Sequence, residues 1–147
     1  MKGGWVFLLQ LFLLLYAVHG AVRYYEFDVR TATMMLADSQ SRPAMVVNGQ
    51  FPGPTIDVLE VINSPLLCVI VTYCISSFQG DLVEIKVKNN MGDVDNESLT
   101  IHWHGIHQRG TPYSDGVSVL TQCAIPAGKE MKYSFTAYPS GTHFWHS

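Results

Sequence analysis

The sequence has 147 residues, of which 48% are hydrophobic and 14% charged, a composition that excludes a disordered chain and suits one domain with a modest core. Only nine residues are Lys or Arg, they form no basic run, and the formal net charge is -3, which excludes the usual electrostatic basis for binding nucleic acid. The mean hydropathy of +0.14 is high for a globular domain, so we expect the apolar excess to lie in particular segments.

The first 20 residues are typical of a secretory signal peptide. Lys2 precedes an apolar run from Trp5 to Val18, and the small residue Gly20 follows. An uncleaved membrane anchor or a buried helix is the alternative, but the run of about 14 residues is shorter than the roughly 20 that span a bilayer. We expect cleavage after Gly20 and a secreted, extracellular chain of residues 21–147 that is free of the membrane. In that oxidising compartment, Asn96 would be an acceptor for N-linked glycosylation, because Ser98 completes its tripeptide.

After residue 20, apolar and polar residues alternate with a period of two, and no helical stripe of useful length occurs. Short strands at such spacing, bounded by Gly, Pro, Asn or Asp, predict an all-β sandwich or barrel. The strands that we predict are 24–29, 45–47, 55–59, 82–88, 99–104 and 130–137. The clearest is 82–88, where Val83, Ile85 and Val87 alternate with charged residues, as expected for one buried and one wet face.

Residues 61–79 form an atypical insert that contains no charged residue and two of the three cysteines. As protein, this segment is either one buried strand or an exposed segment prone to aggregation. A third interpretation is a retained intron translated in frame, because Val codons begin with GT and Phe78-Gln79 can be encoded as pyrimidines followed by CAG. Removing the segment joins Glu60 to Gly80 and predicts a hairpin between residues 55–59 and 82–88.

Two histidines share one face of the predicted strand 99–104. The alternation places His102 and His104 opposite Leu99, Ile101 and Trp103. Side by side, two neutral imidazoles can bind one metal ion or two neighbouring ions. The alternative is a pair of histidines that merely face solvent.

Five of the six histidines lie between His102 and His146, and this clustering favours a metal site. Alternation near the end of the chain places His146 on the same face as Phe144 and sends His143 to the opposite face. We therefore expect His143 to be a bystander and His107, which lies beyond Gly105, to be a loop or packing residue. Ligation by imidazoles alone suits copper, zinc or iron rather than calcium or magnesium.

Several motifs, in order and at matching spacing, closely resemble the first cupredoxin-like domain of laccases and related multicopper oxidases. An entry segment over residues 47–56 matches upstream. The other matching motifs are His102-Trp103-His104-Gly105, Gly110-Thr111-Pro112, Asp115-Gly116, Thr121-Gln122-Cys123 and Gly141-Thr142-His143-Phe144-Trp145-His146-Ser147. The resemblance covers about residues 24–147 apart from the insert.

This resemblance implies a plastocyanin-like Greek-key β-sandwich that would be the first of three in a secreted oxidase. In such enzymes a blue copper takes electrons from a small reducing substrate such as a phenol, a metal ion or ascorbate. A trinuclear copper cluster then reduces dioxygen to water. By position, His102 would ligate the type 2 copper, and His104 and His146 the type 3 pair. Asp115 would lie beside the cluster, orienting ligands or water and relaying protons, unless it is a plain Asp-Gly turn residue.

The chain also departs from the family pattern. It stops at Ser147, one residue before the second histidine of the closing motif, and it lacks the downstream domains. Cys123 resembles a cysteine whose disulfide partner lies in the absent C-terminal region. We therefore expect a truncated domain without its last strands, inactive alone, that contributes half of the trinuclear site. The alternatives are a secreted single-domain copper-binding protein without catalysis, and a structural β-sandwich without metal.

Overall fold

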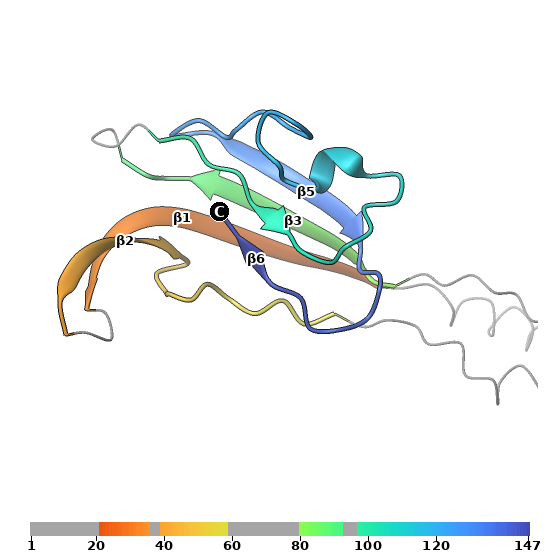
Figure 1. The fold of residues 1–147 in the computed structure, drawn as a ribbon, viewed down its shortest axis with the longest axis horizontal. Helices are drawn as coiled ribbons and strands as arrows, with labels where there is room; N and C mark the ends of the chain where they lie inside the picture. The colour runs from red at the N-terminus through yellow and green to blue at the C-terminus, as the bar shows by residue number, and fades with distance from the viewer. Residues whose placement is uncertain (1–20, 36–38, 59–79, 93–96) are drawn as a thin grey trace, which may run out of the picture.

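The four central strands form one sheet, and two short strands form a second (Figure 1). This computed structural model describes residues 21–35, 39–58, 80–92 and 97–147. The large sheet has the order β2-β1-β3-β5, and the small sheet pairs β4 with β6. The bounds are β1 Val22–Met35, β2 Ser41–Val47, β3 Leu82–Asn89, β4 His102–Trp103, β5 Glu130–Thr136 and β6 Trp145–His146, and a 3-10 turn, η1, lies at Pro112–Ser114. The predicted all-β class is confirmed.

Strand β1 is long because its two halves pair with two different strands. Its first half, from Val22 to Val29, runs parallel to β3, whereas its second half, from Val29 to Met35, runs antiparallel to β2. At the start of the parallel pair, the buried carboxylate of Asp81 accepts hydrogen bonds from the backbone N–H of Ala21 and from Nε of Arg23, both at 2.8 Å. This contact fixes the beginning of β1 against the beginning of β3.

The alternation predicted for residues 82–88 is confirmed in β3. Val83, Ile85 and Val87 are at most 1% exposed and face the core. On the other face, Lys86 pairs with Glu130 and Lys88 with Glu26, at 2.8 and 2.6 Å. Such exposed ion pairs contribute about 0–1 kcal/mol each, so burial of the apolar face is what holds β3 in place.

An aromatic cluster joins the two layers. Trp103 of β4 and Trp145 of β6 lie against Phe27 of β1, with ring centroids 6.2 and 4.9 Å apart. Trp103 also packs against Phe135 and, edge to face, against Tyr133 of β5. Figure 1 shows β6 and the end of the chain lying across the sheet at this point. This packing orients the short histidine-bearing strands relative to the large sheet.

Tyr133 also binds the small layer by a hydrogen bond. Its hydroxyl accepts the backbone N–H of Ile101 at 3.0 Å, and both residues are at most 1% exposed. Burial raises the pKa of the Tyr133 phenol. The phenol therefore stays neutral and supplies an acceptor for the residue that precedes β4.

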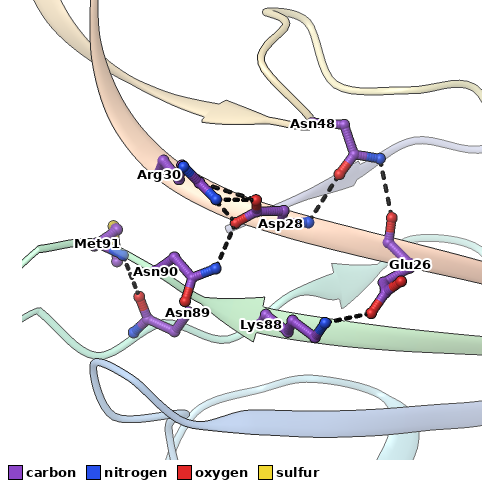
Figure 2. Close-up of polar contacts among 8 residues, drawn as sticks. All are labelled: Glu26, Asp28, Arg30, Asn48, Lys88, Asn89, Asn90 and Met91. Atoms are coloured by element: carbon purple, nitrogen blue, oxygen red, sulfur yellow. Dashed lines mark hydrogen bonds and ion pairs between the residues drawn. The ribbon is translucent and has the colours of Figure 1, made fainter.

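Asn48 continues the pairing of β1 beyond the end of β2 (Figure 2). Its side-chain oxygen accepts the backbone N–H of Asp28 at 2.8 Å, and its side-chain nitrogen donates to the carbonyl oxygen of Glu26 at 2.9 Å. Asn48 has a φ of 53°, a left-handed conformation that Asn tolerates better than most residues. The carboxylate of Asp28 accepts from Arg30 and Asn90, and the Arg30 hydrogen bond is the main reason that the pKa of Asp28 is lowered.

Asn89, at the end of β3, is fully buried and hydrogen-bonded on both sides of its amide. It donates to the carbonyl oxygens of Glu97 and Ile125, at 2.8 and 2.9 Å, and it accepts the backbone N–H of Met91 at 3.1 Å (Figure 2 shows the last contact). These bonds tie two loops to the sheet at the end where β3 terminates.

Two strand predictions were wrong in part. Residues 55–58 form no strand, so the predicted strand 55–59 is wrong over its described part, and β3 pairs with β1 and β5 rather than with this segment. Of the predicted strand 99–104 only β4 is regular, and Leu99 forms an isolated bridge with Ile125. Both edges of β3 are paired with more distant segments of the chain, β1 and β5, so no edge is left for residues 55–58.

Three predictions concern residues outside the described part of the chain. These are the signal peptide over residues 1–20, the whole of the atypical insert over 61–79, and the glycosylation acceptor Asn96. Within the described residues, no helix has the length and apolar character needed to cross a membrane.

Candidate metal centre

The pairing of β4 with β6 brings three histidines together. His102 lies opposite His146 in the antiparallel register, and Trp103 lies opposite Trp145. The imidazole centroid of His102 is 4.5 Å from that of His104 and 5.9 Å from that of His146, and the last two rings are 4.9 Å apart. The predicted clustering of these histidines on one face is therefore present in the structure.

His102 has its tautomer set by a main-chain group. Its Nδ1 lies 2.6 Å from the backbone carbonyl oxygen of Asp115. A carbonyl oxygen can only accept, so Nδ1 must carry the hydrogen and Nε2 keeps a free lone pair in the neutral ring. The carboxylate oxygen of Asp115 is more distant, at 3.6 Å from Nδ1. Asp115 thus lies beside the predicted ligand, as expected, but it contacts the ring through its backbone.

His104 and His146 face each other through their Nε2 atoms, 2.8 Å apart. One of the two nitrogens must carry the hydrogen between them, so that hydrogen must move to Nδ1 of its own ring or be lost before both Nε2 atoms can act as ligands. Burial and the neighbouring His102 and His146 lower the pKa of His104, so its ring is neutral near pH 7. Sequence alternation placed Phe144 on this face, and its ring stacks on His104 with centroids 3.9 Å apart and an interplanar angle of 18°.

The donor set fits copper. Neutral imidazole nitrogens are good ligands for copper, and the free Nε2 of His102 together with the facing Nε2 atoms of His104 and His146 are such donors. In the parts of the chain that the structure describes, no three His, Cys, Asp or Glu side chains are already arranged around a single ion.

The other two histidines of the cluster point elsewhere. The ring of His107 packs edge to face on Tyr138, with centroids 5.2 Å apart. Nε2 of His143 lies 3.0 Å from the carbonyl oxygen of Pro139, and its ring covers Gly105, where an added Cβ would lie 2.2 Å from Nδ1. His107 thus packs on Tyr138, one of the two roles expected for it, and His143, the expected bystander, contacts Pro139 and Gly105.

Cys123 is exposed and is the free cysteine among the residues described. Its side chain is accessible, so the predicted disulfide with a cysteine of another segment stays a prediction.

The sequence did not reveal the loop that holds Asp115. Ser114, fully buried in η1, accepts the backbone N–H of Ser134 at 3.1 Å, and Gln108 donates to the Ser114 carbonyl at 3.1 Å. The available signal is the Asp115-Gly116 pair, which by sequence alone indicates a turn or a carboxylate near the metal.

Comparisons with known proteins agree with the fold and with the histidine motifs. Residues 70–147 match the family model described as multicopper oxidase. The chain is 37% identical over 134 residues to an L-ascorbate oxidase of Brassica rapa subsp. pekinensis, covering 91% of this chain and 20% of that protein. It is also 37% identical over 126 residues to laccase-1 of Cryptococcus neoformans var. grubii, covering 85% of this chain and 16% of that protein.

Solved structures confirm the predicted cupredoxin-like β-sandwich. Fet3p, a multicopper oxidase that functions in iron import, aligns with a TM-score of 0.67 at 32% identity, over 85% of this chain and 20% of that one. The multicopper oxidase mgLAC aligns with a TM-score of 0.64 at 34% identity, over 86% and 32%. The chain thus spans a fifth or less of the length of the two curated relatives named above. Copper, the predicted cofactor, is the metal of this family, and the chain belongs to the multicopper oxidases.

Proposed function

We propose that this chain is the copper-binding first domain of a secreted, laccase-like multicopper oxidase. In the full-length enzyme it would contribute half of a trinuclear copper site, where dioxygen is reduced to water with electrons from phenols or similar small donors. The observation that supports this proposal most directly is the meeting of His102, His104 and His146 across the β4–β6 pair.

The proposal gives the three histidines two roles. His102 would offer Nε2 to the type 2 copper while its Nδ1 donates to the Asp115 carbonyl. His104 and His146 would offer Nε2 to the type 3 pair, with Phe144 restricting the rotation of the His104 ring. When bound, copper supplies the one-electron chemistry that the protein side chains lack. The side chain of Asp115, near His102, could exchange protons with water at this edge.

Copper titration of the 147-residue chain tests the proposed ligands. We expect His102→Ala, His104→Ala and His146→Ala each to weaken Cu²⁺ binding and the triple variant to abolish it. His107→Ala and His143→Ala are matched controls, since they remove histidines that pack elsewhere, and they should bind as the unmodified chain does. Copper binding retained by the triple variant would refute the assignment.

The wider proposal needs tests on the longer protein. Sequencing of the mature transcript across codons 61–79 and past codon 147 would show whether the insert is translated and whether the second histidine of the closing motif follows. Oxygen consumption by the full-length enzyme with phenols, ascorbate and Fe²⁺ would then identify its donor. The N-terminus of secreted material is expected at Ala21.

A further inference from the structure

The backbone of Gly116 lies directly against Ile101 and His102, where β4 begins. An added Cβ at this position would lie 1.7 Å from the carbonyl oxygen of Ile101 and 3.0 Å from Cα of His102. Gly116 also has a φ of +86°, in the left-handed region that side chains disfavour. Any larger residue would therefore push the 115–116 backbone away from β4.

This close approach is what allows the Asp115 carbonyl oxygen to reach Nδ1 of His102 at 2.6 Å. The same hydrogen bond forces the hydrogen onto Nδ1 and leaves Nε2 as the free donor. In metal sites generally, the partner of the second imidazole nitrogen sets both the tautomer and the orientation of the ring.

The loop around Gly116 is held from both sides. Before it, buried Ser114 is hydrogen-bonded to β5 through Ser134 and to Gln108. After it, the backbone N–H of Val117 donates to the hydroxyl of Thr121 at 2.9 Å. The loop is thus rigid for reasons independent of His102, and the carbonyl is in place before any metal arrives.

We propose that Gly116 is a positioning residue: by letting the Asp115 carbonyl meet Nδ1 of His102, it fixes the tautomer in which Nε2 is free to bind copper. This inference rests on the proposed function for the role of copper, but the tautomer itself is a property of the metal-free chain. It gives the Asp115-Gly116 pair a main-chain role that is separate from any role of the Asp115 carboxylate.

Gly116→Ala tests the proposal, and Gly128→Ala is its matched control. Both glycines have positive φ, +86° and +71°, but a Cβ at Gly128 would have nothing within 4 Å, so the control carries the same backbone strain without the clash. The readout is the ¹⁵N pattern of the His102 ring in the metal-free, labelled 147-residue chain. We expect a single Nδ1–H tautomer in the unmodified chain and in Gly128→Ala, and a mixture with the Nε2–H form in Gly116→Ala. The same samples should show Cu²⁺ affinity lowered by about 10–100-fold in Gly116→Ala alone.

A pure Nδ1–H tautomer in folded Gly116→Ala, or an Nε2–H form in the unmodified chain, would overturn the proposal. If circular dichroism shows that Gly116→Ala does not fold, the ¹⁵N pattern of His102 in the unmodified chain still decides, because an Nε2–H form there would overturn the proposal. Failure of the unmodified chain to bind Cu²⁺ would refute the proposed function and leave the tautomer result standing.

Discussion

Replacing Tyr133 by Phe is expected to destabilise the fold through a single backbone group. The change keeps the ring against Trp103 but removes the oxygen that accepts the N–H of Ile101. Ile101 is 1% exposed, so water cannot easily replace that acceptor. A buried donor left without a partner costs about 1–3 kcal/mol, which is a large part of the roughly 5–15 kcal/mol that stabilises a typical domain.

Urea denaturation followed by tryptophan fluorescence measures this cost. We expect the midpoint to fall while the slope of the transition stays the same. Tyr24→Phe is the matched control, because Tyr24 is 73% exposed and its loss should change the free energy of unfolding by less than about 0.5 kcal/mol. A Tyr133→Phe variant as stable as this control would refute the reasoning, since it would mean that the Ile101 N–H has no need of the phenol.

The pH dependence gives a second, independent check. Burial raises the pKa of Tyr133 in the folded chain, whereas the unfolded chain ionises near the ordinary value of about 10. Above that pH the unfolded state binds fewer protons than the folded state, so the free energy of unfolding of the unmodified chain falls as pH rises. Tyr133→Phe lacks this contribution. The difference in free energy of unfolding between the unmodified chain and Tyr133→Phe should therefore become smaller in alkaline solution.

Three further changes have equally definite outcomes. Asn89→Ala should lower the free energy of unfolding by about 2–5 kcal/mol, because it leaves three backbone groups without their partner, whereas the exposed Asn90→Ala should cost far less in the same urea titration. Phe144→Ala should weaken Cu²⁺ binding more than Phe144→Tyr, since only the tyrosine keeps the stacked ring on His104, and equal affinities would contradict this role. The pKa of His104 is lowered in the folded chain, so as pH falls below about 6.5 the unfolded chain binds a proton at this residue before the folded chain does, and the free energy of unfolding falls. His104→Gln lacks this contribution. Urea titrations at acid pH should therefore show a smaller loss of stability for His104→Gln than for the unmodified chain.

The sequence predicts best where local alternation decides the structure. The sequence predicts β3 because every second residue, Val83, Ile85 and Val87, is apolar. His102 and His104 share a face because they too are two residues apart. The extension of β1 and the start of β2 were missed because their residues are mixed, and Pro43 suggests a loop. In the structure, Pro43 lies in an edge strand, where proline is tolerated, and the register with Thr33 comes from the partner strand.

The candidate site shows the same division. The motifs and the alternation predict which three histidines meet. The contact between His102 and Asp115 uses a backbone carbonyl, and the type of residue at position 115 does not predict such a contact. It also depends on Gly116 lying against a strand that the fold, rather than the local sequence, puts there. Side-chain chemistry could therefore be predicted at this site, whereas main-chain chemistry could not.

The parallel pairing of β1 with β3 has a consequence for the length of the chain between them. Asp81 meets Ala21 across 60 positions of sequence, and the two strands remain in register from Val22 with Leu82 to Val29 with Asn89. The entropy of closing so long a connection grows only logarithmically, by about 0.6 kcal/mol for each doubling of its length. Deleting residues 61–79 shortens this connection. The resulting change in the free energy of closing it is therefore smaller than the free energy lost when one buried hydrogen bond is removed. A chain without that segment is expected to form the same sheet, with the same histidines facing one another at its edge.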